Sequence, residues 1–204
     1  MTSFNKDIDL YKYEKQYSVL GYDLVAGVDE AGRGPLAGPL VVASVILDSK
    51  YTYKTLIYDS KQLNKKQREE AYIEILAHNI SYNIQIVPPK VIDELNILVC
   101  TKKAMEDSIQ ALEVKPSIAL IDYISLPNID IKNIGITKGD TLSISIAAAS
   151  ILAKVTRDKI MEEYDMLYPE YGFKTNMGYP TKKHYAAIEK YGVLEIHRKT
   201  FRLK

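Results

Sequence analysis

The stretch Val25–Leu47, VAGVDEAGRGPLAGPLVVASVIL, decides the fold of this 204-residue chain. An apolar run over residues 25–28 ends in two adjacent carboxylates, Asp29 and Glu30, and a turn rich in glycine and proline follows. A second apolar run, over residues 40–47, is rich in β-branched side chains. Short runs of this kind bounded by Gly and Pro predict two buried strands joined by a loop.

The two carboxylates stand at the end of a predicted buried strand, where an unpaired charge is costly. A divalent metal ion or a neighbouring basic side chain would reduce that cost, and a solvated strand end is the plain alternative. The turn favours a ligand site, because its glycines at positions 32, 34 and 38 allow the backbone of a polyanion to approach closely.

The composition is that of an ordinary globular protein, with 47% hydrophobic and 26% charged residues. Cys100 is the single cysteine, which excludes a disulfide framework and a cysteine-based zinc cluster, and it fits a buried helical position. We expect a cytoplasmic protein without membrane contact. Residues 1–20 lack the apolar core of a signal peptide, and no apolar run is long enough to span a bilayer.

The charge is unevenly distributed, although the net charge is only +1. Residues 171–204 contain eight basic and two acidic residues, so this segment carries +6 and the preceding 170 residues carry −5. A basic segment beside an acidic pocket suits a polyanion that Lys and Arg hold while metal ions sit on carboxylates. A solvated basic tail is an equally good interpretation of the charge alone.

The remaining pattern predicts a mixed sheet flanked by helices, because a meander is followed by alternating strands and helices. We expect a domain over residues 1–170, with a short helical lead-in, and a basic helical extension over 171–204 packed on it. The predicted strands are 25–28, 40–47, 51–58, 81–87, 117–121 and part of 128–136. The predicted helices are 64–78, 91–112, 141–166 and 181–190, with a loop over 172–180.

Three acidic sites each follow an apolar strand-like run or its turn: Asp29-Glu30, Asp122 and Asp140. If these strands are neighbours, four carboxylates converge, and one or two divalent cations would relieve their repulsion. Ligands that are all oxygen favour Mg²⁺ or Mn²⁺, and two such ions roughly 3.5–4 Å apart serve in-line attack on phosphodiesters. Any one of these residues could instead be a helix cap, Asp140 above all.

A series of short blocks across the chain then resembles one family, ribonuclease HII, the bacterial type 2 ribonuclease H. The resemblance runs in order from about Gly27 to Phe201, and the series is more specific than any single block. The blocks are GVDEAGRGPLAGPLVVASVIL (27–47), DSKQL (59–63), LNI (95–97), LIDY (120–123), KGD (138–140), SIAAASILAKVTRD (145–158), YGF (171–173), GYPT (178–181) and HRKTF (197–201).

The resemblance implies a ribonuclease H-like mixed five-stranded sheet with a helical C-terminal extension. It implies an endonuclease that cuts the RNA strand of RNA–DNA hybrids and nicks duplex DNA 5′ to embedded ribonucleotides, leaving a 3′-hydroxyl and a 5′-phosphate. Such an enzyme would serve ribonucleotide removal during DNA replication and repair. We expect a monomer and leave its protein partners open.

The resemblance also implies roles for individual residues. Asp29, Glu30, Asp122 and Asp140 correspond to the catalytic carboxylates, which hold Mg²⁺ or Mn²⁺, two ions during catalysis. The turn Gly32-Arg33-Gly34 resembles the element whose backbone reads the ribose 2′-hydroxyl, and Arg33 can fork onto a phosphate. Tyr179 resembles the tyrosine that packs on the next sugar and requires a deoxyribose there.

Lys61 is a candidate phosphate contact, with a solvated lysine at a helix start as the alternative. Weaker candidates for the same groove are Lys138, Ser150, Lys154 and Arg157, while His184 and His197 fit structural or phosphate-facing positions better than catalytic ones.

The chain departs from the family pattern after Asp122, where glycine is common and Tyr123 stands instead; residues 124–131 differ as well. Three other interpretations are weaker. Ribonuclease HIII normally carries an extra N-terminal domain and lacks the Gly-Arg-Gly turn. In a non-catalytic nucleic-acid-binding module the four carboxylates would repel the phosphates they face. A phosphotransferase would want a P-loop lysine, and the chain has no GxxxxGK[ST] motif.

Overall fold

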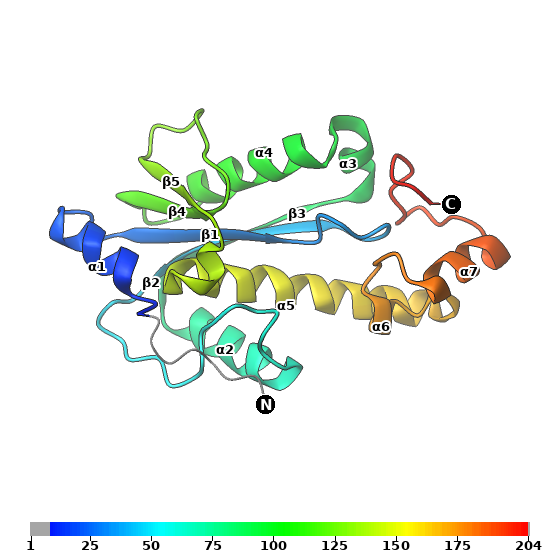
Figure 1. Cartoon of the computed structure of the whole chain (residues 1–204), viewed down its shortest axis with the longest axis horizontal. Coiled ribbons are helices and arrows are strands. Elements are labelled where there is room, and N and C mark those ends of the chain that lie inside the picture. The colour runs from blue at the N-terminus through cyan, green and yellow to red at the C-terminus, as the bar shows by residue number, and fades with distance from the viewer. Residues whose placement is uncertain (1–8, 204) are drawn as a thin grey trace.

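The computed structural model describes residues 9–203, which form one five-stranded sheet between two layers of helices (Figure 1). The strand order is β3-β2-β1-β4-β5. Strand β2 is antiparallel to both of its neighbours, whereas β4 and β5 run parallel to β1. The predicted mixed five-stranded sheet is therefore confirmed. Its strands are β1 (Val25–Ala31), β2 (Leu40–Leu47), β3 (Asn79–Val87), β4 (Ile118–Asp122) and β5 (Asn133–Ile136).

Two helices cover each face of the sheet. Helices α2 (Lys65–Ala77) and α5 (Ile144–Leu167) lie below it in Figure 1, and α3 (Pro89–Leu95) and α4 (Ile97–Gln110) lie above it. The pleat of a strand sends successive side chains to opposite faces. Accordingly, Val41 and Val45 of β2 pack with α2 and α5, while Val42 and Ile46 pack with the α3 and α4 side.

Glycine at position 27 brings α5 unusually close to the central strand. A β carbon on Gly27 would lie 1.9 Å from the backbone carbonyl carbon of Ser145, so no larger residue fits this crossing. The first turns of α5 are small and fully buried, including Ala147 and Ala148. This close packing brings the side chain of Ser150 to the carboxylates near the end of β1, and both line one cleft.

The helix caps agree with the sequence at one predicted position and differ at another. Asn64 accepts a hydrogen bond from the amide of Gln67 at the start of α2, which confirms the predicted cap. Helix α5 begins after Ser143, whose hydroxyl accepts from the amide of Ile146. Asp140 lies in a separate 3₁₀ turn, Gly139–Thr141, so the interpretation of Asp140 as the cap of this helix is wrong.

The third strand predicted over residues 51–58 is wrong, because this segment is irregular and β3 pairs with β2 in its place. Its backbone polar groups are satisfied elsewhere. The carboxylate of Glu74 in α2 accepts from the amides of Lys54 and Thr55 and from the hydroxyl of Tyr51. A side chain from a helix therefore provides the bonds that a strand partner would have provided.

The single helix predicted over 91–112 is divided into α3 and α4 at Asn96. This residue has φ of +65°, and its side chain accepts from the amides of Leu98 and Val99 at the start of α4. Cys100 of α4 is buried, as predicted. The predicted loop over 172–180 also contains one short helix, α6 (Phe173–Asn176).

The C-terminal part is helical, as predicted, and packs on the end of α5 (Figure 1). It contains the 3₁₀ turn Pro169–Tyr171, α6 and α7 (Lys182–Tyr191). Phe173 and Ile188 are buried against Met161 of α5 and Ala37 of the glycine-rich turn. The division into domains at residue 170 stays a prediction. Helix α1 (Lys12–Val19) lies at the other end of the molecule. No helix among residues 9–203 is long and apolar enough to cross a membrane.

Candidate active site

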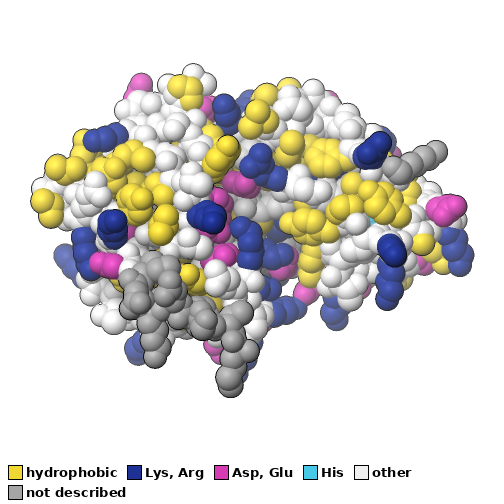
Figure 2. Space-filling view, viewed as in Figure 1, with side chains coloured by type: hydrophobic (Ala, Val, Ile, Leu, Met, Phe, Trp, Pro, Cys, Tyr) yellow, Lys and Arg dark blue, Asp and Glu magenta, His cyan; other side chains and the backbone are white. Residues whose placement is uncertain are grey.

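The site begins where two neighbouring parallel strands end. Val28 of β1 pairs with Ile121 of β4, so Asp29 and Asp122 follow at the same level of the sheet. Both residues line one cleft of about 290 Å³. The other residues that line it are Glu30, Ala31, Gly32, Arg33, Gly34, Ser60, Lys61, Ser150, Lys154, Arg157 and Tyr179. Figure 2 shows acidic side chains in the middle of one face of the molecule, with Lys and Arg around them.

Asp29 is the most strongly perturbed acid in this cleft. It is only 4% exposed, and the amide of Glu30 donates to its Oδ1 over 2.7 Å. Burial, followed by the charges of Glu30 and Asp122, raises the pKa of the Asp29 carboxyl well above its ordinary value. Burial, together with the charge of Asp140, also raises the pKa of Asp122. The amide of Gly139 donates to Oδ1 of Asp122 over 2.7 Å and opposes this shift.

Two basic side chains form ion pairs with the other two acids. The guanidinium of Arg33 is 3.4 Å from Glu30, and the ammonium of Lys61 is 3.2 Å from buried Asp140. Burial lowers the pKa of Lys61, but the charge of Asp140, its hydrogen bond and the charges of Asp29 and Asp59 together outweigh burial, and the net shift is upward. Burial raises the pKa of Glu30, although the charge of Arg33 opposes the shift. Asp140 is not among the residues that line the cleft and joins the site through Lys61.

The glycine turn and Tyr179 form the opposite wall of the cleft. Gly32 has φ of +96°, and a β carbon there would lie 2.2 Å from Nε of Arg157, so the turn requires glycine. A β carbon on Gly34 would lie 3.7 Å from Cε1 of Tyr179, so this glycine faces the aromatic ring. The ring is 43% exposed. The cleft thus presents an acidic floor beside a wall of backbone and aromatic groups.

The donor set fits a hard divalent cation by its chemistry. All four candidate ligands are carboxylates, and among the ion pairs of the described residues Asp29 has none. Within residues 9–203, however, no three acidic, histidine or cysteine side chains surround a common point that would hold an ion. Lys61 and Arg33 hold two of the carboxylates instead. A metal ion bound by all four acids would lie beside the Lys61 ammonium and repel it from Asp140.

The weaker sequence candidates have different surroundings. Ser150 lies 2.8 Å from the hydroxyl of Ser60, and Lys154 pairs with Asp158 at 2.7 Å, and both line the cleft. Arg157 is 1% exposed and donates to backbone carbonyls, so little of it reaches solvent. Lys138 does not line the cleft. His184 and His197 bind each other behind Tyr179, as expected for structural residues.

Sequence reasoning missed Arg198, which is fully buried behind the glycine turn. It donates to carbonyl groups of Gly32, Arg33 and Gly38. The segment HRKTF was the only signal that pointed to it. The partners are up to 166 positions away in the chain, so no local pattern could reveal the contact.

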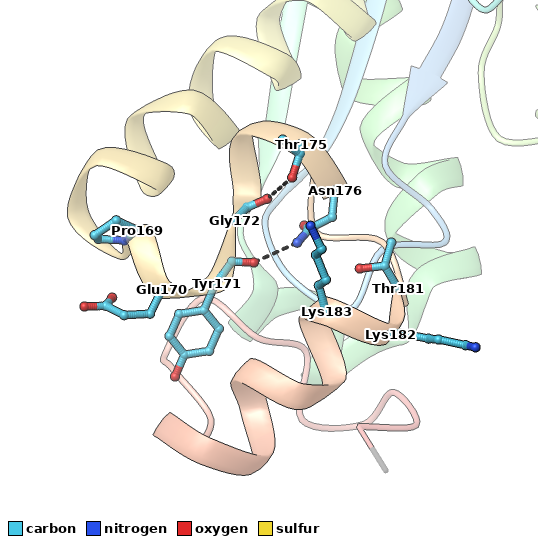
Figure 3. A pocket seen from close by; sticks show the side chains of 9 residues that line it. All are labelled: Pro169, Glu170, Tyr171, Gly172, Thr175, Asn176, Thr181, Lys182 and Lys183. Carbon is cyan, nitrogen blue, oxygen red and sulfur yellow. Dashed lines mark hydrogen bonds between the residues drawn. The ribbon is translucent and has the colours of Figure 1, made fainter.

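A second pocket, of about 390 Å³, lies between α6 and the start of α7 (Figure 3). Its polar groups bind one another: the side-chain amide of Asn176 donates to the carbonyl of Tyr171 at 2.7 Å, and Thr175 donates to the carbonyl of Gly172 at 2.9 Å. Glu170 is its one carboxylate. This pocket lacks the acid cluster of the cleft and is not the candidate active site.

A mixed sheet of this order, with acidic residues at the adjacent ends of β1 and β4, defines a ribonuclease H-like enzyme. The profile of the ribonuclease HII family matches residues 26–204, and the chain belongs to that family. Members of the family act on the RNA of RNA–DNA hybrids, so the protein is a ribonuclease H.

The chain is 54% identical to ribonuclease HII of Clostridioides difficile strain 630 over 181 residues, which are 89% of this chain and 71% of the relative. The structure of the ribonuclease H2 from Pyrococcus horikoshii OT3 has a TM-score of 0.75 and 31% identity, and covers 88% of this chain and 94% of that one. Bst-RNase HIII, solved in complex with Mn²⁺, has the same fold with a TM-score of 0.66 and 19% identity, over 88% of this chain and 67% of that one.

Proposed function

We propose that this enzyme cuts the RNA strand of hybrids and also nicks duplex DNA on the 5′ side of an embedded ribonucleotide, leaving a 3′-hydroxyl and a 5′-phosphate. Such nicking would begin the removal of ribonucleotides left in DNA by replication. One observation carries the proposal: Asp29 and Asp122, at adjacent strand ends, share a cleft with the Gly32–Gly34 turn and Tyr179. In this proposal a site for phosphodiester chemistry adjoins a site for sugar recognition.

The turn can read a ribose hydroxyl through its backbone. The amides of Arg33 and Gly34 donate to no other residue in the described part of the chain, and both residues line the cleft. Only the 2′-hydroxyl distinguishes RNA from DNA at a given nucleotide. Tyr179, beside Gly34, would pack on the following sugar and leave no room for a second hydroxyl.

Asp29, Glu30, Asp122 and Asp140 would hold two divalent ions, Mg²⁺ or Mn²⁺. When bound, such ions supply an activated water and stabilise the leaving oxygen of an in-line displacement. The Mn²⁺ complex of Bst-RNase HIII is one instance of a divalent ion with a protein of this fold. The raised pKa of Asp29 supports the assignment, because a nearby dication would remove the repulsion among the carboxylates.

Lys61 and Arg33 would bind phosphates of the substrate. The ammonium of Lys61 is the more accessible, with a side chain 75% exposed, and Arg33 is 42% exposed. Both side chains lie on carboxylates in the absence of substrate and would exchange these partners for phosphate oxygens when the duplex and metal ions bind. This exchange would couple metal binding to substrate binding.

The test is cleavage of a labelled duplex that contains one ribonucleotide, compared with an RNA–DNA hybrid, with Mg²⁺ and with a chelator. We expect Mg²⁺-dependent cutting of both substrates, a single nick 5′ to the embedded ribonucleotide, and product ends that a ligase and a phosphatase identify as 3′-hydroxyl and 5′-phosphate. Hybrid cleavage without any nick at the single ribonucleotide would contradict the proposal while leaving the family assignment intact.

A further inference from the structure

Arg198 is a buried cation without an acidic partner; its side-chain hydrogen bonds within residues 9–203 all go to backbone carbonyls, and its guanidinium carbon lies 5.0 Å from the centroid of the Phe201 ring. Its side chain is 0% exposed, and within residues 9–203 it pairs with no carboxylate. Nη1 donates to the carbonyl of Arg33 at 2.9 Å, and Nη2 to that of Gly32 at 2.5 Å. Nε and Nη2 also donate to the carbonyl of Gly38, at 3.1 and 3.0 Å. A buried guanidinium is costly, and the four hydrogen bonds to the turn offset that cost here.

These bonds fix the direction in which the turn presents its amides. In a trans peptide the C=O and the N–H point to opposite sides, and the chain has no cis peptide among its described residues. Because Arg198 holds the carbonyls of Gly32 and Arg33 from behind, the amides of Arg33 and Gly34 point away from it. Arg198 is not among the cleft-lining residues, whereas the turn is. The two amides therefore face the cleft.

The preceding residue, His197, holds Tyr179, the second part of this wall, through a chain of hydrogen bonds. The amide of Leu194 donates to Nδ1 of His197 at 3.0 Å, so the proton of this ring is on Nε2. Nε2 lies 3.1 Å from Nε2 of His184, which must accept. The proton of His184 is then on Nδ1, which donates to the carbonyl of Tyr179 at 3.0 Å. One arrangement of protons satisfies every member of the chain.

Backbone pairing keeps these two residues in place beside the turn. His197 forms a β-bridge with Ala37, and the amide of Arg198 donates to the carbonyl of Leu36 at 2.8 Å. The amide of Leu36 in turn donates to the carbonyl of Gly178, next to Tyr179, at 2.8 Å. Backbone hydrogen bonds thus join the turn both to the Tyr179 loop and to the 197–198 segment.

We propose that His197 and Arg198 are positioning residues that together set the spacing between the Gly32–Gly34 turn and Tyr179, and so determine which pair of sugars the cleft accepts. This inference rests on the proposed function, in which the turn reads one sugar and Tyr179 the next. Neither side chain touches the substrate. Their effect passes through the backbone carbonyls of the turn and of Tyr179.

The test uses Arg198→Met and His197→Phe, which remove the bonds but preserve bulk, and Arg198→Lys, whose single ammonium cannot reach all three carbonyls. Tyr171→Phe is the matched control. It removes one hydrogen bond, 2.7 Å to the carbonyl of Gly192, within the same C-terminal part, and keeps the ring that packs 5.5 Å from the ring of His197. Two quantities are measured for each full-length protein: kcat/KM on an embedded ribonucleotide relative to a hybrid, and hydrogen exchange of peptides that contain residues 33–34 and 179.

We expect Arg198→Met and His197→Phe to lower the kcat/KM ratio by about fivefold or more and to speed exchange in both peptides, with Arg198→Lys intermediate. Tyr171→Phe should leave the ratio within about twofold. A merely structural role would lower the active fraction and so reduce kcat/KM on both substrates equally. An unchanged ratio of the two kcat/KM values therefore overturns the inference. An equal change of this ratio in Tyr171→Phe also overturns it. If Arg198→Met does not fold, Arg198→Lys and His197→Phe decide by the same criteria.

The exchange readout separates this inference from the proposed function. A wild-type enzyme that fails to nick at single ribonucleotides contradicts the proposed function, and exchange alone then decides on the positioning role. Faster exchange of the turn in Arg198→Met and of the Tyr179 peptide in His197→Phe supports it. Unchanged exchange in both variants overturns it.

Discussion

Gly34 and Tyr179 lie side by side in one wall of the cleft, with 3.7 Å between Cε1 of the tyrosine and the position that a β carbon on the glycine would occupy. That distance is an ordinary van der Waals contact, so the fold tolerates a methyl group at position 34. A sugar that lies against both residues from the cleft would meet that methyl group. Substrate and fold therefore place different demands on the same glycine.

Gly34→Ala is expected to leave the thermal unfolding midpoint unchanged and to lower kcat/KM on an embedded ribonucleotide by about tenfold or more, since misplacement of a substrate by a fraction of an ångström is costly. Steady-state kinetics and calorimetry check the two parts. In combination with Tyr179→Ala, which removes the adjacent ring, the effect of Gly34→Ala should shrink. Strictly additive effects would contradict the shared sugar site.

Asp29→Asn should abolish cleavage, by a factor of about 100 or more, without loss of stability. The substitution removes a buried charge whose neighbours repel it, so the unfolding midpoint without metal should stay level or rise. Excess Mg²⁺ should raise the midpoint of the wild type, because ligands that bind the folded state stabilise it, and should raise that of the variant less. Equal Mg²⁺ shifts in the two proteins would remove Asp29 from the metal site.

Acid should weaken the contact behind Tyr179. Burial, followed by the charge of His184, lowers the pKa of His197 from 6.5 to about 4. The unfolded chain binds a proton that the folded chain does not, so the free energy of unfolding falls as pH drops from 6.5 towards 4 and is unaffected above that range. At about 1.4 kcal/mol per pH unit, the loss reaches roughly 3 kcal/mol.

Urea unfolding between pH 7.5 and 5 measures this dependence, with His197→Phe as the comparison. Because carboxylates and His184 also titrate on acidification, the informative quantity is the difference between the two proteins. The variant should lose less stability than the wild type over this interval. Parallel pH profiles would show that the pKa of His197 is the same in the folded and unfolded states, which contradicts the prediction.

Tyr123→Gly should stabilise the protein by about 1 kcal/mol. Tyr123 has φ of +63°, a left-handed conformation that costs L residues roughly 1–2 kcal/mol, and its side chain is 71% exposed, so little packing is lost. Tyr123→Ala is the control, because alanine keeps the β carbon that causes the strain. Chemical denaturation compares the three proteins, and a Gly variant no more stable than the Ala variant would refute the strain argument.

The positions of the acidic residues were largely predictable, because Asp29 and Asp122 follow apolar runs that could only be buried strands. The order of the carboxylates comes directly from that pattern, but β1 was predicted to end at Val28 and runs on through both acids to Ala31. The same reasoning failed over residues 51–58, where apolar and aromatic residues suggest a strand but the side chain of Glu74 provides the hydrogen bonds. Local sequence does not reveal which partner satisfies a segment's backbone.

The supporting contacts of the site could not be predicted from local sequence. Arg198 reaches the turn across 160 or more positions, and its partners are carbonyl groups, which every residue has. The ion pair of Lys61 with Asp140 likewise joins residues that are 79 positions apart. Periodicity reports which face of an element is buried, whereas such contacts depend on the finished packing. The Gly-Arg-Gly turn was recognisable, but the side chain that orients it was not.

The most direct measurement compares three duplexes that differ only at one nucleotide of one strand: ribose, 2′-deoxyribose, or 2′-fluoro-2′-deoxyribose. With Mg²⁺ present, the account predicts a single nick on the 5′ side of the ribose and none in the other two, and no cutting of any duplex in the presence of a chelator. Equal cutting of the deoxyribose duplex, or metal-independent cutting, would contradict a hydroxyl-reading turn beside a metal-holding cluster of acids.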